Sequence, residues 1–75
     1  MEIEVRLFAH LRQLAPDGPI KVVLDDGSTV QRLIDHLGIN NEKNLIIMVN
    51  GRRQEEDTEL FNADRVGIFP PVGGG

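Results

Sequence analysis

Residues 45–54 have the sequence LIIMVNGRRQ, and this stretch decides the kind of fold. The apolar run 45–49 is too short for a helix and rich in β-branched side chains, so it predicts a strand buried on much of both faces. Asn50-Gly51 predicts a two-residue hairpin, because both central positions of a type I′ turn need a positive φ. The chain should return from this turn as a short edge strand, 52–54.

Three further segments alternate between apolar and polar residues, which is the pattern of a half-buried strand. They are residues 2–7, 20–24 and 65–69. In each of them the apolar side chains point to one side, so each strand has a single face to bury. A helical turn and a loop with prolines and a glycine, residues 9–19, should join the first two strands.

One main helix is predicted, from Thr29 to Leu37. Ser28 stands three residues before Gln31, which matches a capping box in which each side chain satisfies a free backbone N–H group. Gly38 can adopt the left-handed conformation that ends a helix. One apolar stripe runs along the helix: Val30, Leu33, Ile34 and Leu37.

These elements predict an α+β fold with two layers. Each element has only one apolar side, so a single helix packed on one face of a mixed sheet of about five strands buries all of them. The chain has 75 residues, which is enough for one domain and too few for two. We expect the domain to span residues 1–69 and residues 70–75 to project from it as a C-terminal tail.

Composition and charge narrow the function. Twelve acidic and eight basic residues give a net charge of −4, and the basic residues are scattered along the chain. This argues against nucleic acid as a partner and favours a partner with a basic docking surface. The chain has no cysteine, which favours a reducing cytoplasm. No segment approaches the roughly 20 apolar residues of a membrane helix, so we expect no membrane partner.

The internal polar residues predict neither a metal site nor an acid–base pair. His10 and His36 are the only imidazoles, and no third ligand stands at a plausible spacing. The acidic run 55–59 lacks the spacing of a calcium loop, so we interpret it as a solvated loop. We therefore look for the chemistry at the C-terminus.

The chain ends in PPVGGG, residues 70–75. Pro70 and Pro71 favour a stiff, extended segment that cannot pair with the sheet. The last three glycines have no side chain, and six extended residues reach roughly 20 Å, enough to bring the carboxylate of Gly75 into a site of another protein. A terminal carboxylate with a pKa of about 3.5 is ionised at neutral pH and can attack ATP that another protein supplies. The alternative is an inert, frayed end.

Two aromatic residues, Phe8 and Phe69, fall on outward positions of two different strands. Singly, exposed apolar residues need no explanation, but a joint patch favours a partner interface. Gly67 lies on the same outward face, where the missing side chain would let a partner's backbone approach.

The chain resembles the MoaD/ThiS family of ubiquitin-like sulfur carriers, and the ending FPPVGGG is most similar to the small subunits of molybdopterin synthases. The resemblance covers the whole chain. It rests on Phe8-Ala9, Leu11-Arg12-Gln13-Leu14, the helix 29–37, Val49-Asn50 and the tail. It implies the β-grasp fold. Gly73 departs from the family pattern, which more often has a residue with a side chain there.

The resemblance implies that the chain is a carrier and not an enzyme. A ubiquitin-activating-type enzyme uses ATP to adenylate Gly75, a sulfurtransferase or cysteine desulfurase supplies sulfur, and the resulting thiocarboxylate donates it inside the large subunit of molybdopterin synthase. The chain itself binds no cofactor. The implied docking residues are Phe8, Gly67, Phe69, Pro70, Pro71 and Val72, followed by Gly73 and Gly74, which thread the partner's channel.

Other functions share the same tail. Sulfur delivery to thiazole, to cysteine synthesis or to tRNA thiolation uses the same terminal chemistry, and so does attachment to lysines as a protein modifier. A β-grasp interaction module with an inert terminus is the alternative outside this class.

Overall fold

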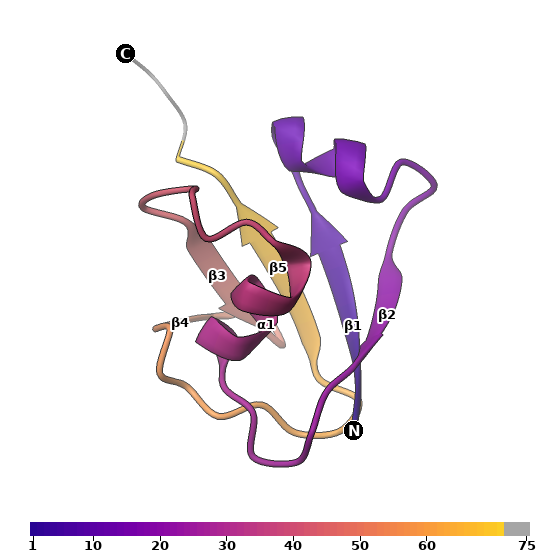
Figure 1. Cartoon of the computed structure of the whole chain (residues 1–75), viewed down its shortest axis with the longest axis vertical. Coiled ribbons are helices and arrows are strands. Elements are labelled where there is room, and N and C mark those ends of the chain that lie inside the picture. The colour runs from indigo at the N-terminus through magenta and orange to yellow at the C-terminus, as the bar shows by residue number, and fades with distance from the viewer. Residues whose placement is uncertain (72–75) are drawn as a thin grey trace.

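The computed structural model describes residues 1–71 and contains one mixed sheet of five strands. The strands are β1 (Glu2–Leu7), β2 (Ile20–Val23), β3 (Ile46–Val49), β4 (Arg52–Gln54) and β5 (Arg65–Phe69), in the spatial order β2-β1-β5-β3-β4. The helix α1 (Val30–Leu37) covers one face of the sheet, and a 3-10 helix, η1 (Ala9–Leu14), joins β1 to β2 (Figure 1). This arrangement confirms the predicted two-layer α+β fold.

The two central strands, β1 and β5, run parallel, and the other neighbours in the sheet are antiparallel. Alternation along the strands sends one set of apolar side chains toward α1, where Ile3, Leu33 and Ile68 are fully or almost fully buried. Every buried side chain in the described part of the chain is apolar or a proline. The core is therefore a single layer between the sheet and the helix, as the alternation predicts.

The start of α1 differs from the prediction. Thr29, not Ser28, is the N-cap, and its Oγ1 accepts a hydrogen bond from the backbone N–H of Arg32 at 3.4 Å. The side chain of Gln31 donates to Asp35 Oδ1 at 3.0 Å instead of returning to the backbone of Ser28. The capping box was therefore the wrong interpretation of this sequence.

The physical reason lies in the segment between β4 and β5. Its carbonyl groups accept the first free N–H groups of the helix: Val30 N–H donates to Thr58 O at 2.9 Å, and Gln31 N–H donates to Glu56 O at 2.8 Å. With these donors satisfied from outside the helix, a reciprocal side-chain cap is not required. At the other end, Gly38 closes the helix with a φ of 73°, as predicted.

The hairpin between β3 and β4 confirms the Asn50-Gly51 prediction, with φ values of 52° and 83°. The prediction for β3 itself was only half right. Ile47 and Val49 are buried, but Ile46 and Met48 are half-buried, because no second layer covers the outer face of the sheet in residues 1–71.

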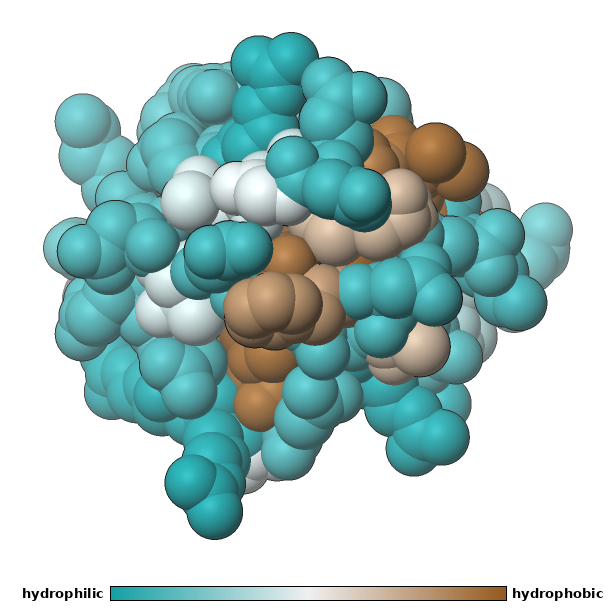
Figure 2. Space-filling view, turned by 90° about the horizontal axis from the view of Figure 1, so that it is seen from below, coloured by the Kyte–Doolittle hydropathy of each residue, from teal (hydrophilic) through white to brown (hydrophobic). Residues whose placement is uncertain are grey.

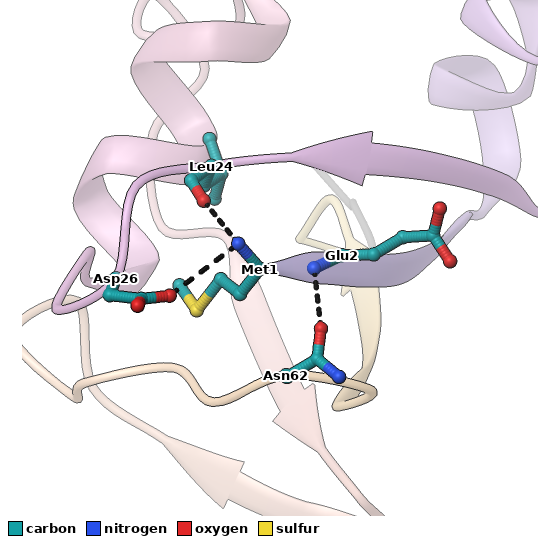
Figure 3. Close-up of polar contacts among 5 residues, drawn as sticks. All are labelled: Met1, Glu2, Leu24, Asp26 and Asn62. Atoms are coloured by element: carbon teal, nitrogen blue, oxygen red, sulfur yellow. Dashed lines mark hydrogen bonds and ion pairs between the residues drawn. The ribbon is translucent and has the colours of Figure 1, made fainter.

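Polar contacts hold together the end of the molecule that carries the N-terminus (Figure 3). The ammonium group of Met1 donates to Leu24 O at 2.8 Å and lies 3.5 Å from the carboxylate of Asp26. The backbone N–H of Glu2 donates to Asn62 Oδ1 at 2.8 Å. These contacts join the start of β1 to the end of β2 and to the segment that leads into β5.

The same end of the molecule carries an apolar patch within a largely hydrophilic surface (Figure 2). The segment between β4 and β5 crosses this end (Figure 1), and Phe61 on that segment is 62% exposed. The C-terminal end of β5 lies at the opposite end of the molecule from this segment. None of the helices in the described residues combines the length and the apolar character that a membrane crossing requires.

Candidate functional site

The candidate site lies where β5 ends and the tail begins. Because β1 and β5 are parallel, their C-terminal ends lie side by side, and Phe8 N–H extends the ladder by donating to Ile68 O at 3.2 Å. Pro70 is buried and Pro71 is exposed, so the first residue of the predicted tail still belongs to the packed domain. Val72, Gly73, Gly74 and Gly75 lie outside the described residues, and their roles stay predictions.

Phe8 and Phe69 form a stacked pair next to this exit. Their ring centroids are 4.1 Å apart and the ring planes differ by 7°. Both residues are only half-buried. The structure therefore brings together the two outward aromatic residues that the sequence placed on different strands.

Gly67 lies beneath the stacked pair. A Cβ atom at this position would come within 3.3 Å of a ring carbon of Phe69 and 3.4 Å of a ring carbon of Phe8. The space above Gly67, expected to admit a partner's backbone, is thus occupied by the chain's own rings. The absence of a side chain lets the edges of both rings approach the backbone of β5.

Two apolar residues that the sequence did not single out extend the aromatic pair. The sheet register places Met48 opposite Gly67 and Ile46 opposite Phe69, and both are half-buried on the outer face. We call the surface formed by Phe8, Ile46, Met48, Gly67 and Phe69 the aromatic face. The continuous apolar run of β3 hides which of its residues point outward, although the register of the Asn50-Gly51 hairpin could have revealed it.

A shallow hollow of about 220 Å³ adjoins the aromatic face. Its lining includes Phe8, Met48 and Gly67 of the aromatic face together with Glu4, Arg6 and Arg65. The hollow is smaller than the roughly 300 to 1,000 Å³ of a typical small-molecule site. Its position favours a contact with another protein's surface.

The two histidines, for which the sequence predicted no role in the chemistry, lie at the surface. His10 Nε2 lies 3.1 Å from Glu42 Oε1 at the surface, and His36 is exposed on α1. Across residues 1–71, no cluster of three or more His, Cys, Asp or Glu side chains could hold a metal ion. The described part of the site thus offers an exposed apolar surface at the end of β5 and no reactive group of its own.

Comparison with known proteins agrees with this arrangement. The model of the ThiS family matches residues 5–75. A curated relative, the molybdopterin synthase sulfur carrier subunit of Arabidopsis thaliana, is 26% identical over 81 residues, which cover 100% of this chain and 84% of the relative.

Three solved structures resemble the chain over nearly its whole length. The putative molybdopterin converting factor subunit 1 of Pyrococcus furiosus is 32% identical with a TM-score of 0.78, covering 96% of this chain and 99% of that one. The small archaeal modifier protein 1 of Methanosarcina acetivorans is 28% identical with a TM-score of 0.69, covering 99% and 96%. Subunits 1 and 2 of the molybdopterin-converting factor of Helicobacter pylori were solved as a complex, and the matching chain is 22% identical with a TM-score of 0.67 and complete coverage of both chains.

The last of these structures supports the fold alone, and the others extend the likeness to sequence. The relatives whose names state a role are small carrier or modifier proteins. Together with the five-stranded sheet, its single main helix and the match over residues 5–75, these findings show that the chain is a β-grasp, ubiquitin-like protein and a member of the ThiS family of sulfur carriers.

Proposed function

We propose that this chain carries sulfur as a thiocarboxylate on Gly75 and serves as the small subunit of a molybdopterin synthase. One observation carries the proposal: Phe69 belongs to the aromatic face, and in the sequence it is followed directly by the ending PPVGGG. A reactive terminus needs a docking surface close to it, so that a partner can hold the domain while the tail enters its site. The relationship to the sulfur carrier subunit of Arabidopsis thaliana supports the same role.

The chemistry would proceed in two stages at Gly75. A carboxylate oxygen attacks the α-phosphorus of ATP held by a ubiquitin-activating-type enzyme, which forms an acyl-adenylate and releases pyrophosphate. The persulfide of a sulfurtransferase or cysteine desulfurase then displaces AMP, and a thiol reduces the acyl disulfide to free the thiocarboxylate. Because this chain has no cysteine, the persulfide and the thiol both come from partners.

The chain's own residues would position the terminus. Pro71 restricts φ at the start of the exposed tail, and Gly73 and Gly74 keep it narrow enough for a channel. The large synthase subunit and the activating enzyme would each need the aromatic face next to this exit. They would therefore bind the carrier in turn, not together.

The second candidate is a protein modifier, which would use the same adenylated glycine. The 28% identity to a small archaeal modifier protein favours it specifically. Delivery of sulfur to thiazole, to cysteine synthesis or to tRNA thiolation would differ from the synthase role and from the modifier role in the protein that receives the sulfur. Co-purification from the native cell separates these routes, because a large synthase subunit identifies the molybdopterin pathway and lysine-linked conjugates identify a modifier.

The test of the carrier chemistry is the intact mass of the chain. We expect co-expression with its activating enzyme and a sulfur source to replace one terminal oxygen by sulfur. The matched control has one glycine appended after Gly75; it should neither gain sulfur nor release pyrophosphate, because its new carboxylate is out of register with the enzyme's site. An unchanged mass of the wild-type chain beside an enzyme that is active on a known carrier would instead support an inert interaction module.

A further inference from the structure

The outer face of the sheet has a charge opposite to that of the whole chain. Its outward positions carry four basic residues, and only two acidic ones, Glu2 and Glu4, share them. The basic residues are Arg6, Lys21, Arg53 and Arg65. Half of the eight basic residues in the sequence thus lie on this face, against two of the twelve acidic residues.

The three arginines among these four basic residues border the aromatic face. The register forms one row across the sheet in which Arg6 lies opposite Gly67 on one side and Arg53 lies opposite Met48 on the other. Arg65 is two residues before Gly67 on β5 and lines the shallow hollow with Arg6. We call Arg6, Arg53 and Arg65 the arginine rim.

In the described part of the chain, the guanidinium groups of the arginine rim form no ion pair, although Glu4 lies opposite Arg65 in the sheet. All three side chains are exposed. The ion pairs found within residues 1–71 are Met1–Asp26, His10–Glu42 and Lys21–Glu2, so none of them involves a rim guanidinium. The rim's donors are therefore available to another molecule.

We propose that the ubiquitin-activating-type enzyme which receives the tail presents an apolar socket bordered by aspartate and glutamate side chains, which pair with the arginine rim. This inference rests on the proposed function, because it assigns the chemistry of the partner at the same exit. Arginine suits the role, since its planar group can make two parallel hydrogen bonds to one carboxylate. Aromatic residues, methionine and arginine are also enriched at protein interfaces relative to the rest of the surface.

The net charge of −4 had suggested the opposite, a basic partner. That expectation averages over the whole surface, whereas attraction at a docking site depends on the charges within about a Debye length, roughly 8 Å at physiological salt. The acidic residues lie mainly outside this face, for example in the exposed run 55–57 between β4 and β5. The charges close to the aromatic face therefore decide whether an acidic or a basic partner is favoured.

An acidic protein fits this surface better than a nucleic acid does. Phe8 and Phe69 stack on each other and lie over Gly67, so each ring already uses one face that a base would need. Glu4 lines the hollow together with Arg6 and Arg65, and its negative charge would repel a phosphate. A protein surface can place its own carboxylates beside the arginines and away from Glu4.

The test measures binding of the source organism's ubiquitin-activating-type enzyme to charge-reversed variants, without ATP, by calorimetry at several NaCl concentrations. We expect Arg6→Glu, Arg53→Glu and Arg65→Glu each to lower affinity about 3- to 10-fold, and the triple variant to lower it at least about 100-fold. Arg32→Glu is the matched control, because it makes the same charge change at an exposed position on α1. The wild-type affinity should fall with salt, and this dependence should be largely lost in the triple variant.

Three results would overturn the proposal: no measurable binding of the wild-type chain, a triple variant that behaves like Arg32→Glu, or tight binding of a short oligouridylate that the triple variant loses. The single variants keep the test informative if the triple variant fails to fold. Sulfur loading of the wild-type chain is followed separately by intact mass. If binding depends on the arginine rim but the chain gains no sulfur, only the proposed function is contradicted. If the chain gains sulfur but binding does not depend on the arginine rim, only the proposed role of the rim is contradicted.

Discussion

Gly67 shows how one missing side chain shapes the docking surface. Its position in the middle of β5 is unfavourable for a glycine by about 0.5 to 1 kcal/mol relative to alanine, because glycine loses more backbone freedom on folding. The rings of Phe8 and Phe69 occupy the space that a side chain at this position would need. The same rings give the exit of the tail its aromatic character.

We expect Gly67→Ala to change the free energy of unfolding by no more than about 0.5 kcal/mol, because the gain in strand preference offsets a small displacement of the rings. Affinity for the activating enzyme should fall about 2- to 10-fold, since the displaced rings would fit the partner's surface less well. Urea unfolding and calorimetry measure the two effects. When Phe8 is already replaced by alanine, Gly67→Ala should lower the affinity little further. An equal loss of affinity with and without Phe8 would mean that the rings do not mediate the effect.

Asn50 combines a left-handed conformation with a side-chain clamp. Its Nδ2 donates to Asp64 Oδ1 at 2.9 Å, and its Oδ1 accepts from the backbone N–H of Arg65 at 3.0 Å. The backbone N–H of Asn50 also donates to Arg65 O at 2.8 Å. The hairpin turn is thereby fastened to the start of β5.

Two substitutions separate these contributions. Asn50→Gly keeps the positive φ but removes both side-chain hydrogen bonds, so unfolding should become easier by about 1 to 2 kcal/mol. Asn50→Ala also loses the conformational preference and should cost about 1 kcal/mol more. Urea unfolding of the three proteins measures both steps, and a glycine variant as stable as the wild type would show that the clamp contributes nothing.

At the scale of elements, α1 begins where a segment distant in sequence meets it. The strip from Glu55 to Glu59 supplies carbonyl groups to the first turn, and an isolated bridge joins Thr29 to Glu59. The helix has only eight residues, which is too short for stability in isolation, so this docking and its buried stripe maintain it. Its boundary is consequently a tertiary property.

The cap provides a test that distinguishes two adjacent residues. Thr29→Ala should lower the free energy of unfolding by about 0.5 to 1 kcal/mol, the lower part of the usual range for an N-cap, because the hydrogen bond from Arg32 N–H is long. Ser28→Ala is the matched control and should change stability by less than about 0.3 kcal/mol. Thermal or urea unfolding gives the comparison. A larger effect at Ser28 would restore the capping box that the sequence suggested.

At the scale of the whole molecule, the fold separates two ends. One end holds the N-terminal contacts of Met1 and the exposed Phe61, and the other carries the aromatic face beside the exit of the tail (Figures 1 and 3). Partner recognition should therefore tolerate a change at Phe61, which belongs neither to the aromatic face nor to the arginine rim.

Phe69→Asp and Phe61→Asp form the matched pair. We expect Phe69→Asp to retain the fold, because the side chain is only half-buried, and to weaken binding of the activating enzyme about 10- to 100-fold by placing a carboxylate in an apolar contact. Phe61→Asp should bind like the wild type. Circular dichroism of both variants checks the fold, and calorimetry measures their affinity for the activating enzyme. Unaltered affinity of Phe69→Asp would remove this residue from the interface.

Much of this architecture could be predicted from local patterns. Alternation along β1 and β5 identifies their core faces and places Phe8 and Phe69 outward, and the Asn50-Gly51 pair specifies the hairpin. Such features depend on a few neighbouring residues, whose conformational preferences act within one element. The α+β class and the terminal glycines were likewise readable without a structure.

Only the tertiary structure decided how these elements meet at the site. Residues more than fifty positions apart, such as Phe8 and Phe69, become neighbours because β1 and β5 pair in parallel at the centre of the sheet. The same pairing seats the rings over Gly67, and the strand order gathers arginines from β1, β4 and β5 around them. The sequence by itself determined which elements form and which face each one buries, since those are local preferences; the docking surface depends on long-range strand pairing, which is settled when the core is buried.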